Sequence, residues 1–152
     1  MNAVTAMLID APGVLVDGRG VPLPAAEPVL VRMRLAQVPV LVFAEDPLAP
    51  EALAPLGNSV DAITALIAPA GFPAVRALLQ ACRNHAVELA SSWMLTARVA
   101  ALQAAATAGI PQAVWLGPEP PRRPPLLRIE TARDLADAPR VMIPAGGGCW
   151  HG

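Results

Sequence analysis

The chain has 152 residues, 55% apolar and 15% charged, so it can bury the core of one domain and is too apolar for a disordered segment. Its formal net charge of −1 gives no reason to expect nucleic acid or an anionic membrane as a partner. No apolar run reaches the roughly 18 residues of a membrane-spanning helix, and Asp10 interrupts the first apolar stretch too early for a signal peptide. The two cysteines are far apart in sequence, so we expect no disulfide framework and predict a cytoplasmic location.

Short apolar runs alternate with helical patterns along residues 1–117. The runs predict strands at residues 7–10, 38–43, 61–67, 92–95 and 113–116. Helical patterns lie between them, at residues 24–35, 50–56, 73–89 and 99–108, the last ended by a C-cap glycine, Gly109. Strand and helix in regular alternation predict a Rossmann-like α/β domain, with a parallel sheet and helices on both faces.

The composition changes at Gly117, which divides the core at residues 1–117 from three further segments. Residues 118–127 form a proline-rich connector that we expect to be extended. Residues 128–144 are predicted to complete the same domain, with a short helix that starts at Thr131 and a last strand at residues 141–143. Residues 145–152 form a glycine-rich tail that carries a Cys-Trp-His sequence.

The sequence resembles the haloacid dehalogenase-like (HAD) phosphatases in two places. Asp10-Ala11-Pro12-Gly13-Val14-Leu15 is similar to their first motif, a strand that ends in Asp-x-Asp-Gly-[Thr/Val]-Leu. Ser92-Trp93-Met94-Leu95, together with the glycine-ended helix after it, is similar to the capless branch that hydrolyses histidinol phosphate or heptose bisphosphate. The resemblance covers residues 7 to 116 and implies a HAD-type domain without a cap.

The resemblance also implies where catalytic residues should stand. The family's nucleophile, the first Asp of that motif, matches Asp10. Side chains that cannot fill the family's roles occupy the positions of the general acid, the phosphate-binding hydroxyl, the lysine and the two metal-binding carboxylates: Pro12, Ala44, Ala68, Ala97 and Ala101. Arg76 or Arg83 could replace the lysine, whereas the carboxylates that follow Ala44 would repel a phosphate. We therefore expect no catalytic residues, no metal and no cofactor.

Asp10 then needs another role. It either caps the adjacent helix, pairs with Arg98, or keeps some role toward a ligand. If Arg98 lies beside Asp10, its positive charge would disfavour a metal cation at that carboxylate. Of the remaining candidates, Cys82 and the two strand tryptophans are expected to pack in the core or at the sheet edge, and His85 to lie at a helix end.

The preferred function is that of a non-catalytic HAD-like subunit that binds, stabilises or regulates another protein. Its expected contact residues lie in the connector and the tail: Arg122, Arg123, Cys149, Trp150 and His151. Two alternatives stay open. One is a residual phosphohydrolase that uses Asp10, and the other is a carrier or substrate protein whose Cys-Trp-His tail is modified or binds metal.

Overall fold

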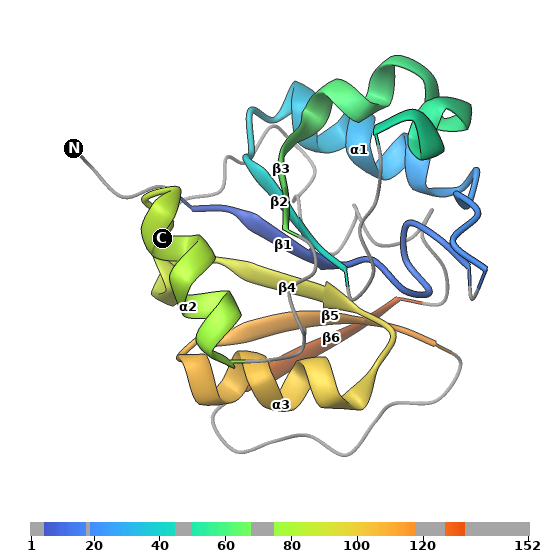
Figure 1. Cartoon of the computed structure of the whole chain (residues 1–152). Helices are drawn as coiled ribbons and strands as arrows, with labels where there is room; N and C mark the ends of the chain where they lie inside the picture. Colours follow the sequence, from blue (N-terminus) through green and yellow to red (C-terminus); the bar gives the residue numbers. More distant parts are fainter. Residues whose placement is uncertain (1–4, 18, 45–49, 68–74, 118–126, 133–152) are drawn as a thin grey trace.

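The computed structural model describes residues 5–17, 19–44, 50–67, 75–117 and 127–132 (Figure 1). The elements in chain order are β1 (Met7–Asp10), α1 (Ala26–Leu35), β2 (Val40–Phe43), the 3-10 segment η1 (Pro50–Ala62), β3 (Ile63–Ile67), α2 (Val75–Asn84), the 3-10 turn η2 (Leu89–Ser91), β4 (Trp93–Thr96), α3 (Val99–Ala108), β5 (Gln112–Leu116) and β6 (Arg128–Ala132). The five strands predicted from the sequence are all present, so their positions are confirmed.

The six strands form one parallel sheet in the order β3-β2-β1-β4-β5-β6. The chain builds outward from β1 through β2 to β3, and then returns to place β4 on the other side of β1. In sheets of this kind ligands bind at such a reversal, beyond the carboxyl ends of the strands. The reversal lies where Ile9 of β1 pairs with Leu95 of β4, one residue before Asp10 and Thr96.

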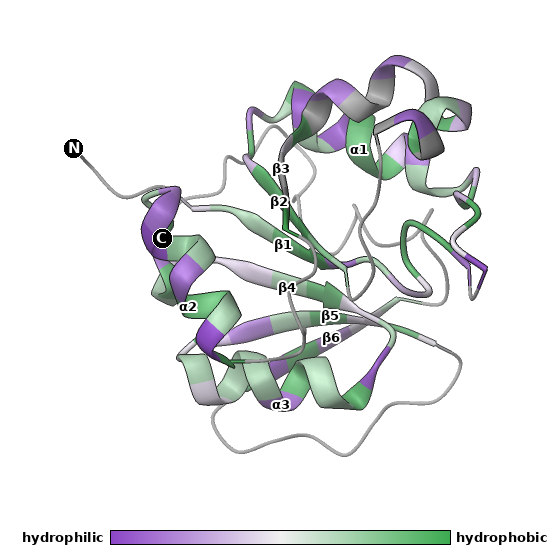
Figure 2. Ribbon diagram, in the orientation of Figure 1, coloured by the Kyte–Doolittle hydropathy of each residue, from purple (hydrophilic) through white to green (hydrophobic). Residues whose placement is uncertain are grey.

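Alternate residues of the strands fill two separate cores, one on each face of the sheet. On one face Met7 and Ile9 pack with residues of α1 and η1. On the other face Leu8 and Phe43 pack with α2 and α3. Figure 1 shows α1 and η1 on one side of the sheet and α2 and α3 on the other, and β2, in the middle of the sheet, is green and therefore hydrophobic in Figure 2. The predicted doubly covered parallel sheet is therefore confirmed.

The three α-helices that the structure describes end in the same way, with a residue in the left-handed region one or two positions after the last helical residue. These residues are Gln37, Ala86 and Gly109, with φ of 58°, 54° and 97°. The next amide in each case donates back to a carbonyl five residues earlier: Val38 to Met33 at 3.0 Å, Val87 to Cys82 at 2.8 Å and Ile110 to Ala105 at 2.9 Å. This is the Schellman motif. Gly109 is the C-cap glycine that the sequence predicted.

One predicted helix end needs correction because of local geometry. Helix α2 ends at Asn84 rather than near residue 89, since Ala86 adopts the left-handed conformation that closes the Schellman motif. Helix α1 ends at Leu35 as predicted; Leu35 itself is 72% exposed in the last turn, whereas Leu30 and Met33 are buried against the sheet.

The predicted helix start at Thr131 is also wrong, because Thr131 and Ala132 belong to β6. Each pairs in parallel with a residue of β5, namely Trp115 and Leu116. The remainder of the predicted helix, the strand at residues 141–143 and the tail lie outside the described residues. No helix in the described ranges is long and apolar enough to cross a bilayer.

Candidate functional site

Asp10 ends β1 at the point where the strand order reverses, and its side chain is fully buried. Strands β2 and β4 flank β1 on its two sides, so the carboxylate sits at the centre of the sheet's carboxyl edge. A buried carboxylate is costly unless hydrogen-bond donors compensate it. The side chains that donate hydrogen bonds to Asp10 therefore indicate which role this carboxylate can have.

Arg98 supplies most of that compensation. Its Nε donates to Oδ2 of Asp10 at 2.8 Å, and its Nη2 donates to Oδ1 at 2.5 Å. Two parallel bonds between a guanidinium and a carboxylate make a bidentate ion pair, the strongest form of this contact. The Arg98 side chain is 28% exposed, so solvent reaches part of this side chain but not the carboxylate. Of the roles left open for Asp10, the pairing with Arg98 is the one that the structure shows.

Thr96, the last residue of β4, provides the third bond. Its Oγ1 donates to Oδ2 of Asp10 at 2.8 Å and accepts the backbone N–H of Arg98 at 2.9 Å. One hydroxyl therefore holds both the carboxylate and the backbone of the residue that pairs with it. Sequence reasoning did not single out Thr96. The sequence feature that could have identified it is a threonine at the end of β4, the strand that pairs with β1.

The loop after β1 packs against the loop after β4. Gly13 has φ of 78°, and a Cβ placed on it would lie 3.2 Å from Cβ of Ala97. The loop is tight, because the carbonyl of Ala11 accepts bonds from the amides of residues 14, 15 and 16. Ala97 and the Asp10 loop are thus neighbours, in keeping with the resemblance, but no carboxylate stands at either Pro12 or Ala97.

The other predicted positions are dispersed or lie outside the described residues. Ala44 is buried directly after β2, where its amide donates to the carbonyl of Ile67 at 3.2 Å. Ala101 is fully buried in the core between α3 and the sheet. Arg76 and Arg83 are exposed on α2 and make no bond to Asp10. Six predicted positions lie outside the described residues: Ala68, the connector residues Arg122 and Arg123, and the tail residues Cys149, Trp150 and His151.

The residues present do not fit the magnesium ion that the HAD resemblance implies. Mg²⁺ takes hard oxygen ligands in near-octahedral geometry. Here both oxygens of Asp10 are bonded to a cationic side chain, and alanine stands at both metal-binding carboxylate positions, 97 and 101. Among the described residues, no three His, Cys, Asp or Glu side chains come together in a way that could hold a metal. The charge that a cation would supply at Asp10 is supplied by Arg98.

The remaining candidates behave as core or surface residues. Burial raises the pKa of the Cys82 thiol to about 11, which keeps it protonated at neutral pH. His85 is exposed just after α2. Trp93 is nearly buried, with the guanidinium of Arg128 5.5 Å from the centre of its ring. These positions agree with the packing roles that the sequence predicted.

No protein-family model and no curated protein sequence matches the chain. Solved structures do match it. A D,D-heptose 1,7-bisphosphate phosphatase from B. bronchiseptica, complexed with magnesium and phosphate, is 18% identical over 92% of this chain and 98% of its own, with a TM-score of 0.63. An L-2-haloacid dehalogenase is 12% identical over 92% and 99%, with a TM-score of 0.72.

A HAD phosphatase from Thermococcus onnurineus is 18% identical over 83% of this chain and 59% of its own, with a TM-score of 0.63. At such identities a similarity shows the shared fold and nothing finer. The sheet order, the carboxylate at the end of β1 and these structural matches agree with the resemblance found in the sequence. The chain therefore has the fold of the haloacid dehalogenase-like phosphatases and dehalogenases.

Proposed function

We propose that this chain is a non-catalytic HAD-like protein that serves as a small cytoplasmic subunit, binding and stabilising or regulating another protein. The observation that carries the non-catalytic part is the bidentate pair between Arg98 and Asp10. It engages both oxygens of the carboxylate at the position of the family's nucleophile.

A carboxylate in this state is a poor nucleophile. Attack on phosphorus needs an oxygen lone pair that faces the substrate, whereas Asp10 is buried and Thr96 and Arg98 donate to it. Pro12 has no proton to give to a leaving group, and Ala44 has no hydroxyl to hold a phosphate oxygen. The charge that develops in phosphoryl transfer would thus lack the stabilising groups that such reactions require.

The rival function is a residual phosphohydrolase, and an activity assay separates the two. The full chain is incubated with MgCl₂ and a panel of phosphate monoesters, and released phosphate is measured beside the Asp10→Asn variant. The proposal predicts equal background rates for the two proteins. Phosphate release by the native chain that Asp10→Asn abolishes would establish the enzyme instead.

The subunit role is supported by composition and by surface apolar residues. The chain is 55% apolar, and the described surface includes large apolar side chains at Val21, Leu35, Leu79 and Val99. The test is affinity purification of the full chain from its native host, beside a version that lacks residues 145–152. We expect one stoichiometric partner with the full chain. A monomer in both preparations would contradict the subunit role.

A further inference from the structure

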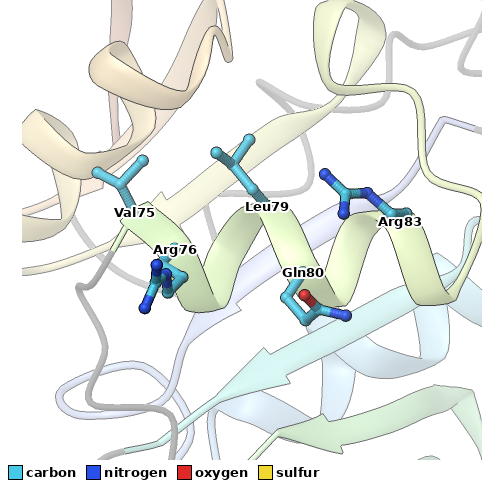
Figure 3. A pocket seen from close by; sticks show the side chains of 5 residues that line it. All are labelled: Val75, Arg76, Leu79, Gln80 and Arg83. Carbon is cyan, nitrogen blue, oxygen red and sulfur yellow. The ribbon is translucent and has the colours of Figure 1, made fainter.

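The outer side of helix α2 has a surface hollow of about 370 Å³. Five residues of this helix line it: Val75, Arg76, Leu79, Gln80 and Arg83. Figure 3 shows Val75 and Leu79 rising together from one side of the helix, with Arg76 and Gln80 on another. Arg83 projects from the same side as Val75 and Leu79, so each side of the described lining carries a positive side chain.

The two arginines of this hollow have no counter-charge among the residues that the structure describes. Arg76 and Arg83 are exposed, and neither has an ion pair or a hydrogen bond with any residue that the structure describes. Helix α2 itself contains no Asp or Glu. By contrast, Arg98 and Arg128 each contact a carboxylate. The α2 surface is thus a local positive site on a chain whose net charge is −1.

The spacing of the two arginines restricts what can bind them. Seven residues of α-helix separate their Cα atoms by about 10 Å along the axis. A single small anion held by both arginines would leave the apolar side chain of Leu79 uncovered. Two carboxylates seven residues apart on a second helix have the same spacing. Leu79, which is 37% exposed, lies between the arginines and would receive an apolar side chain from the middle of that helix.

The geometry points to α2 as the docking surface for an acidic amphipathic helix of the partner protein, with two carboxylates about two turns apart on either side of an apolar residue. This inference rests on the proposed subunit role and adds the surface and the chemistry of the partner. A net charge of −1 gives a nucleic acid or an anionic membrane no long-range attraction. A local contact between oppositely charged helices does not need long-range attraction to the whole chain.

The test uses the full chain labelled with ¹⁵N and two synthetic helical peptides of about 20 residues, long enough to form a helix. One peptide carries Glu at positions seven apart with Leu midway, and the other carries Lys in place of Glu. We expect the acidic peptide alone to shift the amide signals of residues 75–84. The double variant Arg76→Glu/Arg83→Glu should weaken that binding by about tenfold or more and should bind the Lys peptide instead.

The matched control is Arg32→Glu/Arg34→Glu, which makes the same change of net charge on α1 and should leave peptide binding unchanged. Absence of saturable binding, shifts centred outside α2, or equal binding of both peptides would overturn the inference. Binding of phosphatidylserine vesicles or of a single-stranded oligonucleotide that depends on Arg76 and Arg83, without binding of the acidic peptide, would overturn it too. If the partner recovered from the host still binds the Arg76→Glu/Arg83→Glu variant, only this surface is rejected and the subunit role stands.

Discussion

Arg98 holds both carboxylate oxygens of Asp10, through Nε at 2.8 Å and Nη2 at 2.5 Å, across the junction between β1 and β4. The two residues are far apart in sequence and meet because the strand order reverses there. This junction is where proteins with such sheets place their ligands. Here the guanidinium of Arg98 neutralises the carboxylate of Asp10, so the charge at this position is balanced by the chain's own side chain.

The first prediction concerns the stability that this pair provides. Arg98→Ala leaves a fully buried carboxylate without its counter-charge, so it should lower the free energy of unfolding by about 3 kcal/mol. Urea denaturation measures this. Arg32→Ala removes an exposed arginine of α1 and should change stability by no more than about 0.5 kcal/mol. Equal losses of unfolding free energy for Arg98→Ala and Arg32→Ala would show that the Asp10–Arg98 pair does not stabilise the fold.

A double-mutant cycle isolates the interaction itself. We expect Asp10→Ala and Arg98→Ala together to cost less than the sum of the single changes, with a coupling of about 1 kcal/mol or more. The reason is that either single substitution leaves one charged side chain without its counter-charge, and the second substitution removes that side chain. Strict additivity would mean that the two side chains do not interact in solution.

The second prediction concerns Thr96, whose hydroxyl connects Asp10 to the backbone of Arg98. Thr96→Val keeps the shape but removes the donor and the acceptor, and should cost about 1 to 3 kcal/mol because both partners lose a bond. Thr96→Ser keeps the hydroxyl and should retain most of the stability in the same denaturation experiment. A harmless Thr96→Val would show that the hydroxyl bonds are dispensable.

The third prediction concerns the helix ends. Gln37 and Ala86 occupy left-handed positions that favour glycine, at φ of 58° and 54°. Ala86→Gly and Gln37→Gly should each raise the free energy of unfolding by up to about 1 kcal/mol, because they relieve backbone strain. Gly109→Ala should lower it by a similar amount. Ala100→Gly within α3 serves as the control and should cost about 1 kcal/mol. Destabilisation by Ala86→Gly would contradict this description of the helix end.

The fourth prediction concerns Cys82, a buried thiol whose pKa is raised to about 11 by burial. Alkylation requires the thiolate, so the folded protein should react slowly with iodoacetamide at pH 8, and the rate should rise only as the pH approaches 11. The Cys149→Ser background leaves one thiol to follow. Mild urea should accelerate the reaction by opening the core. Fast modification of the folded protein would contradict the buried position.

The sequence predicts the central part of this fold well, because the strands are continuous apolar runs with clear turn residues between them. Helix α3 was predicted with its exact bounds, since Gly109 marks its end. The end of α2 was missed because Ala86 takes the same conformation without being glycine. Strand β6 was missed because Arg128, Glu130 and Thr131 make it polar, and its existence depends on pairing with β5.

The candidate site was predictable only in part. The Asp10–Arg98 pair was one of several roles that residue type and expected position left open. The bond from Thr96 depends on the register between β1 and β4, which local patterns do not contain. Likewise, no sequence pattern showed that Arg76 and Arg83 would both be exposed without an ion pair to a residue that the structure describes.

The central claim is that Arg98 takes the place of a divalent cation at Asp10, and thermal unfolding in MgCl₂ tests it most directly. A ligand at a hundredfold excess over its Kd stabilises a folded protein by about 2.7 kcal/mol, so a bound metal would raise the melting temperature clearly. We predict that MgCl₂ shifts the melting temperature no more than NaCl of the same ionic strength. A saturable rise with MgCl₂ that Asp10→Asn abolishes would contradict the account.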